Sequence, residues 1–169
     1  GWSLTEGHFG EVFWGRGNCW ITAAIPELLK TTYSVIGSVD KKVLEEAYKR
    51  QVYALIENQD ISGMWHTIIN DPESYFETSA SAGFSYGILQ GIKLGILDES
   101  YYLNSYMAVR YIVSNYLDED GSLAQVSAGT AMGYDKEHYK NIGFCQTPYG
   151  QGLLILAILE LENSEGFYD

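Results

Sequence analysis

The stretch from Thr78 to Gly95 reads TSASAGFSYGILQGIKLG, and it decides the fold class. Small and polar residues occupy nearly every position, which is typical of a tightly packed buried helix rather than an amphipathic surface helix. Gly83, Gly87, Gly91 and Gly95 recur every four residues. Such a stripe lets a neighbouring helix come close, despite the cost of Gly in a helix. The polar Ser, Tyr and Gln side chains exclude a membrane span here.

Helical patterns also precede this stretch. A helix is expected from about Cys19 to Lys30, capped by Asn18, with a kink or an early stop at Pro26. Asp40 is a good N-cap for a second helix. The apolar stripe of this second helix consists of Val43, Leu44, Ala47, Val52, Leu55 and Ile56. Charged residues lie mostly opposite the stripe, which predicts an outer, solvated helix.

Two further helices are expected after the small-residue stretch. Glu99 to Leu117 is amphipathic, and a turn at Asp118–Gly121 follows it. Residues 122–147 are rich in loop-forming residues. The last helix, from about Tyr149 to Glu162, is apolar almost all round and is therefore expected to be buried.

Buried and amphipathic helices thus alternate along the chain, with loops rich in Gly, Trp, His and Tyr before the buried ones. This order predicts an all-α fold, an (α/α) toroid whose inner helices line a central cleft. About three such hairpins are half of a six-hairpin (α/α)6 barrel, and residues 1–169 are expected to form a single domain. A half toroid would leave Thr78–Gly95 and Tyr149–Glu162 uncovered on one side. We therefore expect self-association or a partner chain.

Composition narrows the ligand class. The chain has 14 Tyr and 4 Trp, whose rings stack on sugars but more often fill cores and interfaces. Its formal net charge is −12, from 10 Lys and Arg against 22 Asp and Glu, without a basic run. A nucleic-acid partner is therefore not expected. An anionic ligand would need local cations to overcome the acidic background.

The two cysteines bear on the compartment. Cys19 and Cys145 lack metal-site spacing and are too few for a disulfide scaffold, so free thiols in a cytoplasmic protein are expected. No metal or organic cofactor is indicated. The sequence shows neither a secretory leader nor a bilayer-spanning run, so no membrane partner is expected. The chain begins with Gly1 rather than Met, which leaves a tag remnant, processing and excision from a longer protein as alternatives.

The segment Phe13–Trp20 carries the most chemical information. Arg16 lies between two glycines, with Trp14 before it and Trp20 after it, at the start of an expected helix. A guanidinium binds carboxylates through a planar fork, and a helix N-terminus adds positive potential. Trp supplies a stacking surface. The alternative is a structural Arg16 that satisfies loop carbonyls, with Trp in the core, and the sequence leaves both interpretations open.

The segment Trp14-Gly15-Arg16-Gly17-Asn18-Cys19-Trp20 resembles the Trp-x-Arg-Gly-Asn-Gly-Trp signature of unsaturated rhamnogalacturonyl hydrolases and unsaturated glucuronyl hydrolases, glycoside hydrolase families 105 and 88. Four further segments resemble family motifs in the same order. They are Gly63–His66, Tyr75–Ala82, Val126–Thr130 and Pro148–Gly152. Together the motifs cover essentially the whole chain. Cys19 replaces the usual Gly of the signature.

The resemblance implies a six-hairpin barrel and a substrate ending in a 4,5-unsaturated uronic acid. It also implies that an Asp protonates the double bond, after which water adds and the glycosidic link is lost. Trp14, Arg16 and Trp20 match substrate-contacting positions, with Arg16 suited to the uronate carboxylate. Trp65, His66 and the loop that ends at Tyr149 are candidates for the cleft rim. A structural role for His66 is at least equally compatible with the sequence.

The resemblance also implies an incomplete site. The family's catalytic Asp lies upstream of the Arg-Gly-Asn segment, and only Glu6 and Glu11 supply carboxyl groups before Arg16 here. Glu77 is the local candidate for an acid, because burial at a helix start would raise its pKa. A helix-terminal or hydrogen-bonding role for Glu77 is preferred. We therefore expect either an enzyme that needs an N-terminal half-barrel, a non-catalytic module binding acidic oligosaccharides, or a self-associating remnant.

Overall fold

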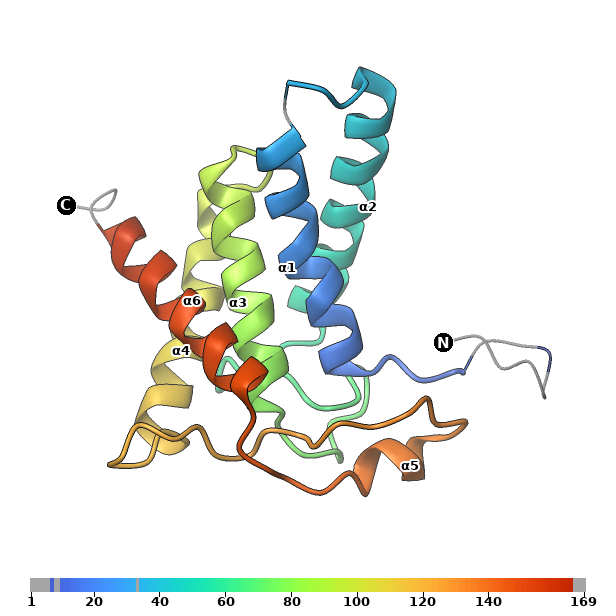
Figure 1. The fold of residues 1–169 in the computed structure, drawn as a ribbon, viewed down its shortest axis with the longest axis vertical. Helices are drawn as coiled ribbons and strands as arrows, with labels where there is room; N and C mark the ends of the chain where they lie inside the picture. The colour runs from blue at the N-terminus through green and yellow to red at the C-terminus, as the bar shows by residue number, and fades with distance from the viewer. Residues whose placement is uncertain (1–6, 8–9, 33, 166–169) are drawn as a thin grey trace.

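The computed structural model describes residues 7, 10–32 and 34–165, whose long regular elements are helices (Figure 1). The elements are α1 (Gly15–Thr32), α2 (Ser38–Glu57), α3 (Thr78–Lys93), the short 3-10 helix η1 (Glu99–Tyr101), α4 (Tyr102–Asn115), α5 (Lys136–Lys140) and α6 (Pro148–Glu165). No helix in these ranges is both long and apolar enough to cross a membrane.

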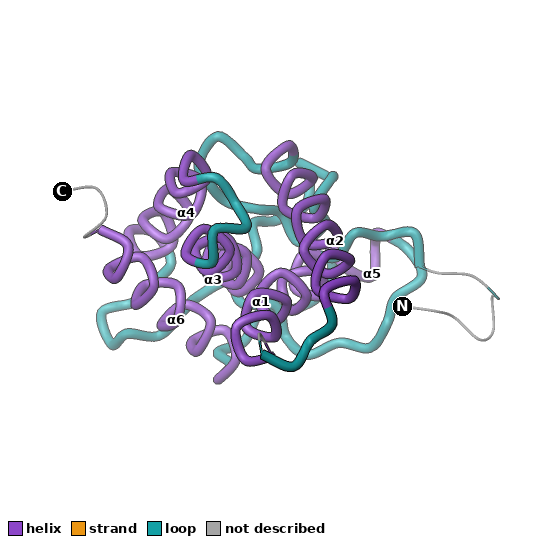
Figure 2. Tube along the Cα trace, turned by 90° about the horizontal axis from the view of Figure 1, so that it is seen from above, coloured by secondary structure: helices purple, strands orange, loops and turns teal. Residues whose placement is uncertain are grey.

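Helix α3 occupies the centre of the fold. It packs against α1, α4 and α6, and the view from above shows α1 and α6 on either side of it (Figure 2). Helices α2 and α4 form an outer layer beside the inner helices α1, α3 and α6. The structure thus contains two inner–outer helix pairs and the inner helix of a third, where the sequence predicted about three pairs.

The burial of α3 confirms the interpretation of its small residues. Every residue from Thr78 to Gly91 is buried. A Cβ atom on Gly87 would collide with the backbone carbonyl of Thr22 in α1, and one on Gly91 would collide with the ring of Tyr48 in α2. The Tyr48 hydroxyl donates to the Gly87 carbonyl at 2.6 Å. Gly95 differs, because it follows the helix with a φ of +68° and serves the turn rather than the packing.

Pro26 does not end the first helix, so of the two expected outcomes, a kink and an early stop, the early stop is wrong. Helix α1 begins at Gly15, earlier than predicted, and continues through Pro26 to Thr32. Proline has no N–H to offer the carbonyl four residues earlier, which is that of Thr22. This is the same carbonyl against which Gly87 packs. The missing helical bond therefore coincides with the closest approach of α3, whose Cα–H groups can face the carbonyl.

Helix α6 exposes several large apolar side chains. Ile155, Leu156 and Leu159 of α6 are 50%, 43% and 56% exposed, so the expectation that this helix is wholly buried is wrong. Its apolar residues surround the helix, and the body of the chain covers only one side of it. The expectation that the inner helices of a half toroid are uncovered on one side agrees with α6 but is wrong for α3, since α1, α4 and α6 enclose it.

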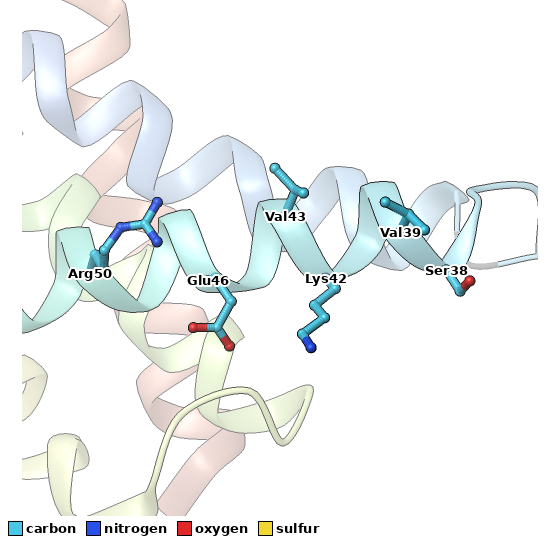
Figure 3. Close-up of a pocket in the computed structure, with 6 residues that line it drawn as sticks. All are labelled: Ser38, Val39, Lys42, Val43, Glu46 and Arg50. Atoms are coloured by element: carbon cyan, nitrogen blue, oxygen red, sulfur yellow. The ribbon is translucent and has the colours of Figure 1, made fainter.

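Helix α2 departs from its predicted stripe in its first half. It starts at Ser38, two residues before the expected cap Asp40, and Val43 is 61% exposed. Val39 and Val43 point to one side of the helix, while Lys42 and Glu46 point to the other (Figure 3). The buried residues Tyr48, Val52 and Leu55 lie further along, so only the second half of the helix packs on the core.

Replacing Gly87 with Ala is expected to lower the free energy of unfolding by about 3 kcal/mol, because the added methyl group must displace a backbone carbonyl rather than a flexible side chain. Gly152→Ala in α6 is the matched control, since no atom lies within 4 Å of its Cβ position. It is expected to raise stability by about 0.5 kcal/mol through helix propensity. Urea unfolding monitored by circular dichroism measures both. Equal effects of the two substitutions would contradict the close-approach model.

Candidate functional site

The N-terminal ends of the three inner helices lie together at one end of the molecule, beside the long connecting segments (Figure 1). Gly15, Thr78 and Pro148 begin these helices. Helix N-termini carry partial positive charge and unpaired N–H groups, and three of them face the same rim. This end is therefore favourable for negative charge, in spite of the chain's net charge of −12.

Arg16 lies at this end, in the first turn of α1, and is only 4% exposed. Its guanidinium donates to the carbonyl oxygens of Ser127 and Ala128, the latter at 2.7 Å. It also donates to the Tyr149 hydroxyl at 3.0 Å. The structure thus shows the Arg16 guanidinium hydrogen-bonded to loop carbonyls, which is one of the two interpretations that the sequence left open.

Aromatic rings surround this guanidinium. Its carbon lies 4.7 Å from the ring centroid of Trp14 and 4.9 Å from that of Tyr149, within cation–π range. Trp20 is 44% exposed and meets Tyr149 edge-on, with 6.2 Å between ring centroids. The structure thus brings together Trp14, Arg16, Trp20 and Tyr149, four of the six substrate-binding candidates from sequence. We call these four residues the Arg16 cluster.

Trp65 and His66 lie elsewhere. Trp65 is fully buried, and its Nε1–H donates to the Leu55 carbonyl at 2.8 Å. His66 is 8% exposed, and its Nδ1 lies 2.5 Å from the carbonyl oxygen of Ser74, which makes Nδ1 the donor. Among the described residues, neither side chain forms a hydrogen bond or ring contact with the Arg16 cluster, and their own bonds support the loop.

Glu77 is fully buried at the start of α3. One carboxylate oxygen accepts from the Ser127 N–H at 2.9 Å, and the other accepts from the Ala80 N–H as the helix cap. The Ser79 hydroxyl bonds both oxygens. Burial raises the pKa of Glu77, while these hydrogen bonds and the charge of Arg16 oppose the rise. The geometry matches the preferred structural role of Glu77, because its oxygens face backbone donors.

The peptide units of Ser127 join these groups, a feature that sequence reasoning missed. The Ser127 N–H bonds Glu77 of α3, and its carbonyl accepts from Arg16 of α1 and from the Tyr149 hydroxyl of α6 at 2.7 Å. Its hydroxyl contacts the Tyr75 hydroxyl at 2.8 Å. The sequence offered only one signal, the family-like motif Val126–Thr130. All three inner helices thus hold one residue of the long loop.

Helix α5 is attached to the same rim by charge. Asp71, which is 7% exposed, pairs with Lys136 at 3.2 Å and with Lys140 at 3.1 Å. The hydrogen bond from Lys140, aided by Lys136, holds the pKa of Asp71 below its usual value. Tyr139 lies between these lysines in sequence and packs on Trp14, with ring centroids 5.4 Å apart. This packing links α5 to the Arg16 cluster.

Within the described ranges, His, Cys, Asp and Glu side chains form no group of three suited to hold a metal ion. Cys19 is buried and Cys145 is exposed, and both are free thiols.

The family model described as Glycosyl Hydrolase Family 88 matches residues 1–165. The chain belongs to this family. It is 32% identical, over 161 residues, to the unsaturated rhamnogalacturonyl hydrolase YesR of Bacillus subtilis (strain 168), covering 92% of this chain and 43% of that protein. The chain therefore spans well under half the length of this family relative.

Solved structures agree with this family assignment. A possible member of the GH105 family from Salmonella enterica superposes with a TM-score of 0.89 at 38% identity, covering 96% of this chain and 43% of that one. The unsaturated glucuronyl hydrolase of Bacillus sp. GL1 shares the fold at a TM-score of 0.67 and 18% identity, covering 91% and 40% of the two chains. These likenesses confirm the predicted fold class, part of an (α/α)6 toroid.

Glu77→Gln is expected to lower the free energy of unfolding by about 2 kcal/mol, because an amide cannot accept from both backbone N–H groups at the α3 cap. Glu73→Gln, an exposed isosteric change in the same loop, is the matched control and should be nearly neutral.

The pH dependence of the stability lost in Glu77→Gln reports on the ionisation of Glu77. Since folding raises the pKa of Glu77, its contribution is fully present below the unfolded pKa and is lost as pH rises through the folded one. The stability difference between the unmodified chain and Glu77→Gln should therefore shrink from acidic to neutral pH in denaturant titrations. A difference that grows with pH would show that the pKa is lowered instead.

Proposed function

We propose that this chain forms part of the cleft of a glycoside hydrolase acting on oligosaccharides that end in a 4,5-unsaturated uronic acid. The observation that carries the proposal is the Arg16 cluster, a buried cation with an exposed Trp20 and a half-buried Tyr149 where three helix N-termini meet. Membership of Glycosyl Hydrolase Family 88 supports it, as does the activity for which the Bacillus subtilis relative is named.

Two properties suit this site to a uronate. Trp20 and Tyr149 offer apolar ring surface for the sugar face, and their edge-on contact fixes their relative orientation. Arg16 and the helix ends supply positive potential for the carboxylate. Since Arg16 already bonds Ser127, Ala128 and Tyr149, it acts from beneath the surface, through its charge and by positioning these groups.

The reaction proposed is hydration of the double bond. A general acid protonates C4 of the enol ether, and water adds at C5 with loss of a proton to the conjugate base. The resulting hemiketal opens and the glycosidic link is lost. Glu77 is linked to the Arg16 cluster through Ser127, but its oxygens face the interior, where they accept from the Ala80 N–H at the α3 cap and from the Ser127 N–H. We therefore assign the acid to an N-terminal half-barrel, supplied in cis or in trans.

Hydrolysis is measured by the loss of ultraviolet absorbance of the conjugated double bond, with an unsaturated rhamnogalacturonyl disaccharide as substrate. The 169-residue chain alone is expected to leave the signal unchanged. Addition of the N-terminal half of a family member should produce turnover. Loss of signal by the chain alone, abolished in Arg16→Ala, would show that an acid is present here and would contradict the assignment.

Within the reconstituted enzyme, Trp20→Ala is expected to reduce kcat/KM about tenfold, equivalent to about 1.4 kcal/mol of lost stacking. Tyr53→Ala on outer helix α2 removes an equally exposed ring, 46% against 44%, and is the matched control. An equal reduction of kcat/KM in the two variants would show that Trp20 does not stack on the sugar.

A second candidate function is binding without cleavage. The interior position of Glu77 favours it, because the chain alone then holds an acidic oligosaccharide without an acid to protonate it. Saturable binding of the disaccharide that persists without turnover, after the N-terminal half is added, would select this function.

The exposed apolar side chains support a partner surface. Ile21 and Leu28 of α1 are 52% and 45% exposed, and Ile155, Leu156 and Leu159 of α6 are exposed to a similar degree. Patches of this kind mark contact sites. The proposed occupant is the N-terminal half-barrel or, in its absence, a second copy of the chain. The exposed free thiol of Cys145 is compatible with the cytoplasmic location that we propose.

The double substitution Ile155→Lys and Leu159→Lys is expected to abolish concentration-dependent association in sedimentation velocity, because two charges would enter an apolar contact. Leu103→Lys on outer helix α4, at a position 63% exposed, is the matched control and should leave association intact. A clean monomer for the unmodified chain at high concentration would overturn the partner surface.

A further inference from the structure

A second cavity, distinct from the Arg16 cluster, lies between α1, α2 and the segment that precedes α3. Its volume is about 380 Å³. Four carboxamides surround an apolar floor, and an exposed ring stands at its edge. The residues used below are Phe13, Asn18, Gln51, Leu55, Asn58 and Asn70. We call this cavity the carboxamide pocket.

The walls of the carboxamide pocket are held in place by hydrogen bonds. The Ile69 N–H donates to the Phe13 carbonyl at 2.9 Å, which joins the segment before α1 to the segment before α3. The Gln51 amide donates to the Asn18 carbonyl at 3.1 Å, which ties α2 to α1. The Asn58 amide donates to the Ala54 carbonyl at 2.8 Å. A pocket fixed in this way binds a ligand without first having to be ordered.

The same bonds set the chemistry of the walls. The amide nitrogens of Asn18, Gln51 and Asn58 each donate to a backbone carbonyl, whereas no described residue donates to their carboxamide oxygens. The Asn70 side chain is exposed and has no hydrogen-bond partner among the described residues. The pocket therefore presents several acceptors, which suit a ligand rich in hydroxyl groups.

The absence of charged lining residues and the presence of apolar surface narrow the chemical class of the ligand further. None of the residues that line the pocket is charged, although 32 of the 169 residues of the chain are Lys, Arg, Asp or Glu. An anion or a cation would lose hydration there without gaining a partner. Leu55 forms an apolar floor at 2% exposure, and the Phe13 ring is 61% exposed at the edge. Such a ring and floor suit the C–H face of a pyranose.

The position of the pocket separates it from the Arg16 cluster. Asn18 follows Arg16 by two residues in α1, and two residues turn an α-helix by about 200°. The two side chains therefore leave α1 on opposite sides. We propose that the carboxamide pocket is a second carbohydrate site, which binds a neutral pyranose unit of an oligosaccharide. This inference is independent of the proposed hydrolysis, since it uses none of the residues of the Arg16 cluster.

The test is an amide NMR titration of the 169-residue chain with methyl β-D-galactopyranoside, compared with the corresponding methyl galactosiduronate. The neutral glycoside is expected to cause saturable shifts at Phe13, Asn58 and Asn70, including the side-chain NH2 signals. The charged glycoside should cause weaker shifts at the same signals. No saturable shift at these signals, or equal affinity for both glycosides, would overturn the proposal.

Two variants locate the binding. Asn58→Ala is expected to weaken the neutral glycoside about threefold to tenfold, the loss of one neutral hydrogen bond. Asn115→Ala is the matched control, because its amide makes the same bond to the carbonyl four residues earlier at the end of α4, at 2.9 Å. Equal weakening in both would overturn the assignment. Asn70→Ala removes a side chain that has no hydrogen-bond partner among the described residues, so this variant is expected to fold normally. If both Asn58→Ala and Asn70→Ala bind the neutral glycoside as tightly as the unmodified chain, the assignment is overturned.

Discussion

The fold depends on backbone contact between α3 and α1. At Gly87 the two helices meet without a side chain between them, and the carbonyl of Thr22 fills the space that a methyl group would need. Pro26 leaves that carbonyl without its helical N–H, so the contact replaces part of what the helix lacks. The spacing fixed there sets how far Arg16, about 1.7 turns before Thr22 in α1, lies from the start of α3.

The Arg16 cluster follows from this spacing. With α1 and α3 close together, Arg16 and Glu77 reach the two ends of Ser127, its carbonyl and its N–H. Opposite charges thus bind the loop from two helices, and Tyr149 adds a bond from a third. The side chains of Arg16 and Glu77 are thus both hydrogen-bonded to backbone groups, which is the condition for keeping such polar groups in an interior. The positive charge of the Arg16 guanidinium is thereby held close to the surface that Trp20 and Tyr149 form.

The sequence predicted those features that depend on local pattern. The buried character of Thr78–Gly91, the turn at Gly121 and the helical order are all visible as spacing of apolar, small and turn-forming residues. The course of α1 through Pro26 was not predictable, because it depends on a neighbour that is distant in sequence. The open side of α6 follows from the half-toroid prediction, whereas its all-apolar pattern alone had suggested complete burial, because such a pattern shows that a helix needs cover but not whether the same chain supplies it.

Within the site, residue type was predictable and residue function was only partly so. Trp14, Arg16, Trp20 and Tyr149 do gather, as four motif residues from opposite ends of the chain. Trp65 has the same chemistry as Trp20, yet it fills the core. The difference lies in which helix face or loop turn each occupies, and only the tertiary arrangement fixes that. The role of Ser127 was not predictable, because its peptide N–H and carbonyl make the bonds, and these groups are the same in every residue but proline.

The attachment of Ser127 has a consequence for how this family diverges. A backbone anchor places little demand on the neighbouring side chains, and the stretch between α4 and α6 is held at Ser127 and again at α5, through the ion pairs of Lys136 and Lys140 with Asp71. Insertions and substitutions between these two anchors, after Ala128 and around Thr130, should accumulate without shifting the inner helices. Relatives that differ in their substrates would then be expected to differ most in the length and composition of this loop, with the anchoring residues unchanged.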